Sequence, residues 1–327
     1  MKSPQDSIGS VLAIVGPTAS GKSALSMALA QASAKKNQSI ELISMDSALV
    51  YRGMDIGTAK PTLNERRQIA HHGIDICDPW QTYSAAHFVK DTHRWIQEIR
   101  ARGNIPVIIG GTMLYWRALT QGLTDLPPAN PEIRQEIEDT AKKLGWMAIY
   151  EQLLELDPIT ANRLAPGDTQ RVQRALEVVI LTGKPMSSIL AENPYGQSRD
   201  DTLIPQCLIS LEPQERSWLH ERIALRFQQM IDAGFIEEME TLMHHPQIHQ
   251  ELPSMRAVGY RQAWEYLKQE ISFDTFKEKS IAATRQLGKR QLTWLRAMPS
   301  RQVIDPSKPE FIKDALQVCL NFINQNH

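Results

Sequence analysis

Residues 16–23 read Gly16-Pro17-Thr18-Ala19-Ser20-Gly21-Lys22-Ser23, which matches the pattern G-x-x-x-x-G-K-[ST]. The stretch follows a short apolar run, 11–15, and opens a segment rich in Ala, Leu and Met, 22–34. A strand, a glycine-rich loop and a helix in this order form a phosphate-binding loop, in which backbone N–H groups and the helix N-terminus bind phosphate oxygens. Lys22 adds a positive charge, and Ser23 can bind Mg²⁺. The stretch therefore predicts a diphosphate or triphosphate ligand.

Further apolar runs predict the rest of a parallel sheet. They cover 40–45, 71–76, 105–109 and 206–211, with helical stretches such as 85–102 between them. Alternating strands and helices indicate a parallel sheet that is covered on both faces. Near Gly122 the pattern changes to a proline-rich linker, 126–131, and a strand-free helical region, 132–183.

We therefore predict an α/β fold, a P-loop NTPase-like parallel sheet flanked by helices, with an all-helical insertion domain. Residues 1–122 and 203–327 are predicted to form the catalytic core, and 123–202 the insertion. The segment between Lys184 and Leu203 gives no clear signal of its role.

Composition sets broad limits on the class of protein. The chain has 327 residues, of which 42% are hydrophobic, and its net charge of −1 neither indicates nor excludes a nucleic-acid partner. Its three cysteines are far apart, so neither a disulfide framework nor a zinc site is expected. Residues 1–10 contain no apolar signal core, and no apolar run approaches the roughly 20 residues of a membrane span. These features predict a cytoplasmic protein that does not interact with membranes.

Polar residues follow the predicted strands where ligands of such sheets bind, beyond the carboxyl ends. Asp46 comes directly after the second strand, where it could accept a proton, cap a helix or bind magnesium. Gly110-Gly111-Thr112 ends the fourth strand, and its two glycines either allow close approach to a ligand or form a tight turn. Asp55 and Asp75 are interpreted as structural.

Arginine pairs lie on two predicted helices. Arg171 and Arg174 follow Asp168, a good N-cap, and so oppose the helix dipole at a cost of about 0.3–1 kcal/mol. A bound phosphate would offset this cost. The alternative is that both residues are ordinary solvated arginines on the surface. Arg222 and Arg226 lie one turn apart after the fifth strand, as a second clamp on the diphosphate or as part of an exposed amphipathic face.

The C-terminal region carries two further basic segments. Residues 279–304 contain no Asp or Glu, and Arg285, Lys289 and Arg296 share a helical face. Trp294 lies among them, and we interpret it as core packing rather than a stacking platform for a base. Residues 256–261 join two arginines with a glycine and a tyrosine. Such concentrations of one charge predict contact with a nucleic-acid backbone.

Several segments together resemble one family. They are the phosphate loop, Asp46-Ser47-Ala48-Leu49-Val50-Tyr51, Gly53-Met54-Asp55-Ile56-Gly57-Thr58-Ala59-Lys60-Pro61, Gly110-Gly111-Thr112, 256–261 and 289–296, in this order. Over nearly the whole chain the sequence closely resembles the bacterial tRNA dimethylallyltransferases. The phosphate loop alone is not specific, but the combination is.

The resemblance implies a dimethylallyl diphosphate donor, Mg²⁺, and an acceptor adenosine at position 37 of tRNA, beside the anticodon. The sequence does not reveal the oligomeric state; with no obligate protein partner evident, we expect a monomer. Asp46 would act as the base near the N6 amine, with Thr18, Lys22 and Arg226 as further catalytic residues. Residues 16–23 and Arg222 would bind the diphosphate, and Ser23 the metal. The implied tRNA contacts are Asp46, Ser47, Ala48, Leu49, Thr112, Arg134, Gln170, Arg171, Val172, Gln173, Arg174, Arg256, Ala257, Val258, Gly259, Tyr260, Arg261, Lys289, Arg290, Gln291, Leu292, Thr293, Trp294, Leu295 and Arg296.

The residues alone leave other functions open. A small-molecule kinase of the same fold would bind ATP in the loop and place Asp46 on an acceptor hydroxyl. A non-catalytic, GTPase-like RNA-binding module is a weaker alternative, because the sequence lacks an obvious N-K-x-D motif.

Overall fold

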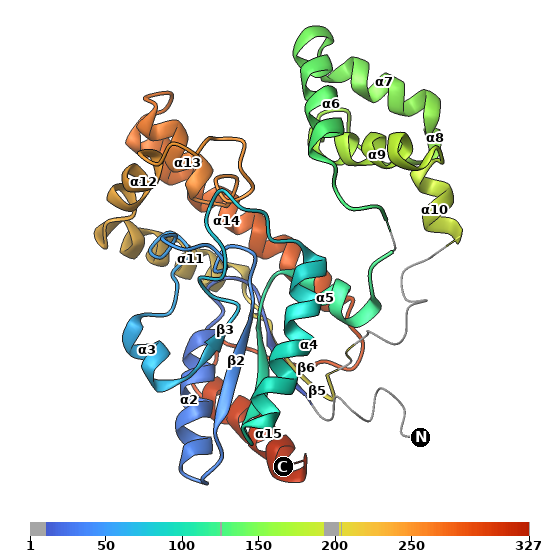
Figure 1. Cartoon of the computed structure of the whole chain (residues 1–327). Coiled ribbons are helices and arrows are strands. Elements are labelled where there is room, and N and C mark those ends of the chain that lie inside the picture. Colours follow the sequence, from blue (N-terminus) through green and yellow to red (C-terminus); the bar gives the residue numbers. More distant parts are fainter. Residues whose placement is uncertain (1–10, 125, 193–202, 204, 327) are drawn as a thin grey trace. The chain divides into compact units, whose positions relative to one another are not determined.

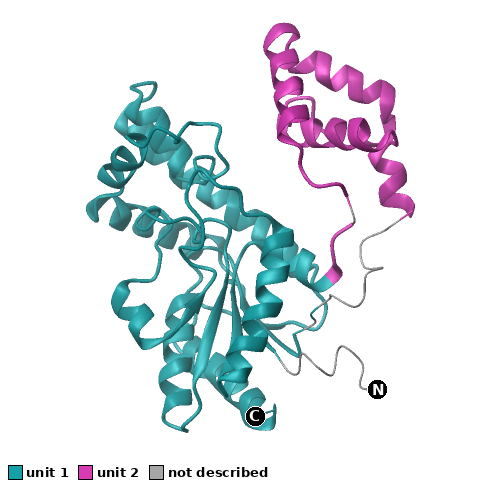
Figure 2. Ribbon diagram, viewed as in Figure 1, with its two compact units in different colours: residues 1–120, 203–327 teal, residues 121–202 magenta. Residues whose placement is uncertain are grey.

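A computed structural model describes residues 11–124, 126–192, 203 and 205–326 of the chain. The N-terminal stretch 1–10 and most of the segment between Lys184 and Leu203 lie outside the described residues. The chain divides into two compact units, 1–120 with 203–327 and 121–202 (Figure 2). The sequence had placed the first boundary after residue 122.

Unit 1 is built on a six-stranded sheet with the order β3-β2-β4-β1-β5-β6, in which every neighbouring pair is parallel (Figure 1). The strands are β1 (Leu12–Val15), β2 (Ile40–Met45), β3 (His71–His72), β4 (Ile105–Gly110), β5 (Cys207–Leu211) and β6 (Gln302–Ile304). The predicted parallel α/β fold is confirmed. The prediction of a third strand over 71–76 was too long, and β6 was missed because a three-residue, largely exposed edge strand carries no apolar pattern.

Helices cover both faces of this sheet. Leu12 and Ile14 of β1 point into the core under α2 (Lys22–Ala34) and α15 (Phe311–Asn326). Ala13 and Val15 point to the opposite face, against α4 (Ala85–Ala101), α5 (Met113–Gln121) and the end of α14 (Phe273–Arg296). Successive side chains of a strand alternate between faces, so a strand with both faces covered is apolar throughout.

A third core of unit 1 lies among the C-terminal helices. It joins α11 (Arg216–Asp232), α12 (Phe235–Met243), α13 (Tyr260–Leu267) and the start of α14 to the segment after β2, including Val50 and Met54. This core holds the segment that follows Asp46 against the C-terminal helices.

The short α3 (Leu63–Gln68) begins with a capping box formed by Thr62 and Glu65.

Unit 2 is entirely helical in its described residues. It contains α6 (Pro131–Leu144), α7 (Trp146–Leu156), α8 (Pro158–Ala161), α9 (Thr169–Thr182) and α10 (Met186–Glu192), around a core of its own. Asp168 caps α9, and Gly183 ends it with a φ of 67°, as the sequence predicted. Throughout the described parts of the chain, helices long and apolar enough to cross a membrane are absent.

Candidate active site

The phosphate loop joins β1 to α2 in the predicted conformation. Gly21 has a φ of 94° and precedes α2, which has no side-chain cap and no acidic residue in its first turn. Ala19 also has a positive φ, 62°, which costs a non-glycine residue free energy. The first N–H groups of α2 therefore lack a capping side chain, as an anion-binding helix end requires.

Lys22 lies at the centre of this loop. Its Nζ donates hydrogen bonds to the carbonyl oxygens of Gly16 and Pro17, at 3.0 and 2.7 Å. Burial and the nearby Arg226 lower the pKa of Lys22 to about 7, and Asp46 opposes both effects. A bound phosphate would favour the charged form of Lys22 and so raise its pKa.

Two arginines of α11 lie at the same loop. Arg222 donates from Nε to the carbonyl oxygen of Ala19, at 2.9 Å, and its guanidinium lies 4.9 Å from the ring centroid of Trp218. Arg226 is half-buried, and burial lowers its pKa while Asp46 raises it and Arg222 lowers it. Arg222 contacts the loop and Arg226 lies within electrostatic range of Lys22, so both arginines lie near the loop, and the clamp on a diphosphate stays a prediction.

Asp46 follows β2 and lies within electrostatic range of Lys22 and Arg226. Its Oδ1 accepts hydrogen bonds from the backbone N–H groups of Ala48, at 2.8 Å, and Leu49, at 3.4 Å. These residues form a turn and not a helix, so the N-cap interpretation is wrong. The turn is tied to the end of β4, since the N–H of Ser47 donates to Oγ1 of Thr112 at 3.0 Å.

The two glycines after β4 allow close packing within the protein. A Cβ at Gly110 would collide with the backbone carbonyl of Met45. A Cβ at Gly111 would lie 2.5 Å from Nε2 of Gln291 and 2.8 Å from the carbonyl oxygen of Gly16. Both glycines are therefore needed for close packing of the chain on itself, and approach to a ligand stays a prediction.

Asp55 and Asp75 have the structural role that the sequence suggested. Both accept from Nζ of Lys60, at 2.5 and 2.6 Å, and this lysine is only 8% exposed. Lys60 also donates to the carbonyl oxygen of Tyr51, at 2.7 Å. The ion pairs therefore anchor the segment that begins at Asp46.

The loop provides suitable groups for Mg²⁺ bound with a diphosphate. Ser23 is exposed in the first turn of α2, and the buried Ser20 hydroxyl has no hydrogen-bond partner among the described residues. Within those residues no group of three or more His, Cys, Asp or Glu side chains could hold a metal by itself. Mg²⁺ is usually bound by few protein oxygens together with substrate phosphates, so this donor set fits it.

Several residues of the expected tRNA-contacting set are buried. Tyr260 is fully buried, and its hydroxyl donates to Oε1 of Glu238 at 2.6 Å. The buried residues of this set are Val172, Gln173, Gly259, Tyr260, Gln291, Leu292 and Leu295. Because these residues are buried, the expected direct contact of their side chains with tRNA is corrected to a packing role, and Gly259 offers no side chain for such a contact. Exposed members include Ser47, Gln170, Arg171, Arg256, Arg261, Lys289, Arg290, Thr293, Trp294 and Arg296.

Two arginines of the set converge on a buried carboxylate in unit 2. Glu177 is 0% exposed and accepts from Arg134 at 2.9 Å and from Arg174 at 2.6 Å. These bonds lower its pKa against the opposing effect of burial. Arg174 also donates to the carbonyl oxygen of Pro127, at 2.6 Å, whereas Arg171 is exposed beside Asp168. The cost of an arginine at this helix end is thus offset within the unit for Arg174, and a bound phosphate is not needed to explain it.

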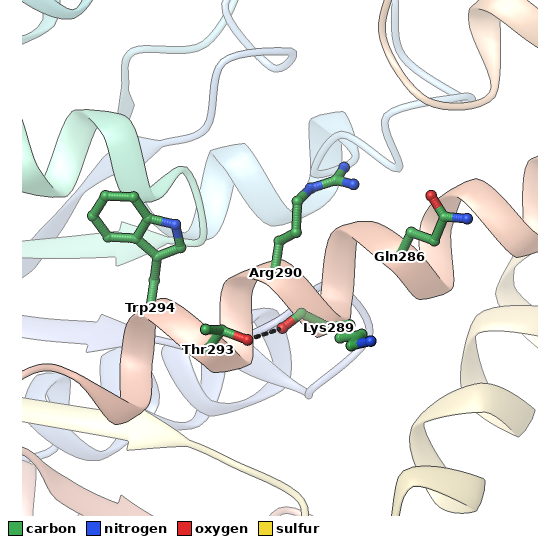
Figure 3. A pocket seen from close by; sticks show the side chains of 5 residues that line it. All are labelled: Gln286, Lys289, Arg290, Thr293 and Trp294. Atoms are coloured by element: carbon green, nitrogen blue, oxygen red, sulfur yellow. Dashed lines mark hydrogen bonds between the residues drawn. The ribbon is translucent and has the colours of Figure 1, made fainter. Parts of the chain in front are cut away.

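The exposed face of α14 lines a cavity of about 420 Å³ (Figure 3). Its lining residues are Gln286, Lys289, Arg290, Thr293 and Trp294. Trp294 is 43% exposed and lies 5.9 Å from the guanidinium of Arg117, so its interpretation as core packing was wrong. An exposed indole among cations is suited to stacking on a nucleobase.

The helix ends at Arg296, and the more distant Arg301 pairs with Glu212 at 2.7 Å.

The sheet, the phosphate loop and the charged groups at its edge define a P-loop enzyme that acts on a phosphorylated ligand. A sequence model named IPP transferase matches residues 49–298. The chain belongs to the IPP transferase family, which confirms the predicted family and the prediction of a transferase.

Curated relatives and solved structures agree with this membership. Two proteins named tRNA dimethylallyltransferase are similar over most of their lengths: one from Polynucleobacter asymbioticus, 52% identical over 94% of this chain and 93% of its own, and one from Burkholderia pseudomallei, 54% identical over 92% and 91%.

A tRNA isopentenylpyrophosphate transferase from Bacillus halodurans has a TM-score of 0.67 and 33% identity, covering 97% of this chain and 98% of its own. A eukaryotic dimethylallyltransferase acting on tRNA has a TM-score of 0.75 and 27% identity, covering 98% and 80%.

Proposed function

We propose that this protein transfers a dimethylallyl group from dimethylallyl diphosphate to the N6 amine of adenosine 37 in tRNA, as a cytoplasmic monomer. The observation that carries the proposal is that Asp46 lies within electrostatic range of Lys22 and Arg226, next to the phosphate loop. A carboxylate that can accept the proton of the amine and a cationic site for the leaving diphosphate lie together at one edge of the sheet.

The site's own groups account for the reaction. The carbon–oxygen bond to the diphosphate breaks as a carbon–nitrogen bond forms to the adenine amine, and Asp46 accepts the proton that the amine loses. The departing diphosphate gathers negative charge, which the loop N–H groups, Lys22, Arg222 and Arg226 stabilise. Mg²⁺, held by Ser23 and the phosphate oxygens, would neutralise part of that charge when bound.

Exposed cations on both units, and an exposed indole on α14, support an RNA acceptor. Lys289, Arg290 and Trp294 line the cavity on α14, and Arg171 is exposed on α9. A chain with a net charge of −1 gains such faces only by local concentration of cations. The adenosine must leave the stack of the anticodon arm to reach the edge of the sheet, and contacts to the surrounding backbone would support that extrusion.

A direct assay separates this function from the kinase alternative. The protein is incubated with unmodified bulk tRNA and dimethylallyl diphosphate labelled in the allyl group, and the tRNA is digested to oligonucleotides that are assigned by sequence. Label is expected on adenosine from position 37. Phosphoryl transfer from ATP to a small acceptor, with no label in the tRNA, would overturn the proposal.

A further inference from the structure

Gln291 connects the phosphate loop to the end of β4. Its Oε1 accepts from the backbone N–H of Thr18 at 2.9 Å, and its Nε2 donates to the carbonyl oxygen of Gly111 at 2.8 Å. The side chain is 8% exposed, and both ends of its amide are used. A buried amide with two such partners holds them in one relative position.

The bond to Thr18 acts on the peptide group that also holds Lys22. The N–H of this group, on Thr18, points to Gln291, and its carbonyl, on Pro17, accepts from Nζ of Lys22 at 2.7 Å. Because a peptide group is planar, orienting its N–H also orients its carbonyl. A continuous chain of hydrogen bonds therefore runs from Gly111 through Gln291 and this peptide to the ammonium group of Lys22.

The surrounding packing leaves Gln291 little freedom. The absence of a Cβ at Gly111 makes room for its amide, and Gly288, one turn earlier in α14, packs near Leu219 and Pro17. Two and three residues further along the same helix, Thr293 and Trp294 are exposed. The helix thus presents one side to the phosphate loop and another to solvent.

We propose that Gln291 is a positioning residue for the donor site, which sets the orientation of the Pro17–Thr18 peptide and through it the position of the Lys22 ammonium. This role differs from the direct RNA contact first expected for Gln291. It rests on the proposed function only in taking the ligand of the loop to be a diphosphate.

Binding of inorganic pyrophosphate with Mg²⁺, measured by calorimetry without tRNA, tests the proposal. Gln291→Met keeps the length of the side chain and removes both hydrogen bonds, so pyrophosphate affinity should fall about 10-fold, which corresponds to the loss of one or two buried hydrogen bonds. Tight binding of tRNA should persist. Gln317→Met, on the exposed face of α15, is the matched control and should bind pyrophosphate like the wild type.

Gln291→Glu provides a second readout that packing alone would not move. Only the protonated carboxyl can both donate to Gly111 and accept from Thr18, so the affinity of this variant relative to wild type should recover as the pH falls. This test also decides the matter if Gln291→Met does not fold.

Unchanged pyrophosphate affinity in a folded Gln291→Met protein, or a pH-independent ratio for Gln291→Glu, would overturn the proposal. Since the probe contains neither a prenyl group nor RNA, a failure of dimethylallyl transfer to tRNA would leave these results standing and would count against the proposed function alone.

Discussion

The carboxylate of Asp46 accepts hydrogen bonds within its own turn. An isosteric substitution can therefore test its catalytic role without removing these bonds. Asp46→Asn retains an oxygen for the N–H groups of Ala48 and Leu49 but cannot accept the proton from the amine. We expect turnover to fall by about 10²–10⁴-fold, as for loss of a general base. Single-turnover rates, measured beside the affinities for donor and tRNA, check this result. Turnover near the wild-type value would remove Asp46 from the mechanism.

Lys22 predicts a proton linkage to donor binding. Its pKa is about 7 in the ligand-free protein, so the amine is mostly neutral at pH 8. A bound diphosphate favours the charged form and raises this pKa, so binding at pH 8 should take up a proton, and donor affinity should fall as the pH rises above 7. The donor phosphates are already deprotonated at pH 8, since their last pKa is near 6.

Calorimetry in two buffers of different ionisation enthalpy measures that proton. Lys22→Arg is the matched control, because a guanidinium stays charged and has no proton to gain. An observed enthalpy that does not depend on the buffer in the wild type would contradict the linkage.

Two arginines of α9 are expected to have different roles: Arg171 contacts RNA, and Arg174 pairs with a carboxylate within the protein. Arg171→Ala should leave thermal unfolding unchanged, because its pair with Asp168 is exposed and such pairs contribute about 0–1 kcal/mol. It should weaken tRNA binding and reduce the magnitude of the log–log salt slope by about one. Filter binding over a range of salt concentrations measures both effects. An unchanged slope would make Arg171 an ordinary surface residue.

Arg174→Ala is the comparison from the same helix. It removes one of the two arginine partners of the fully buried Glu177, which Arg134 still neutralises, so it should destabilise unit 2 by about 1.5–3 kcal/mol, as for loss of a hydrogen bond to a charged group. Thermal unfolding measures this loss. The i, i+3 spacing of Arg174 and Glu177 was visible in the sequence, whereas the approach of Arg134 depends on how α6 packs on α9.

The whole chain should unfold in two steps. The core of unit 2 is made only of residues from that unit, and the three other cores contain none of them. Units with separate cores need not unfold as one cooperative system. Calorimetry should show two transitions, of which Glu177→Gln lowers only one and pyrophosphate raises only the other, since a ligand stabilises the unit that binds it. A single transition that shifts with both changes would contradict the prediction.

The sequence by itself determined the features that arise from neighbours along the chain. A strand, the loop 16–23 and a helix follow from local pattern and glycine placement, and the caps at Asp168 and Gly183 follow from backbone chemistry. The same reasoning placed Asp46 at the carboxyl edge, because parallel strands all end there.

Only the tertiary structure decided which polar residues face the interior. Gln291 lies 273 residues from Thr18 and 180 from Gly111, so no local pattern could reveal that its amide joins them. For the same reason Trp294, expected in the core, is exposed, and Tyr260, expected to contact tRNA, is buried. Burial depends on what other segments pack against a residue, and a hydrogen bond to a distant partner leaves no periodic signal in the sequence.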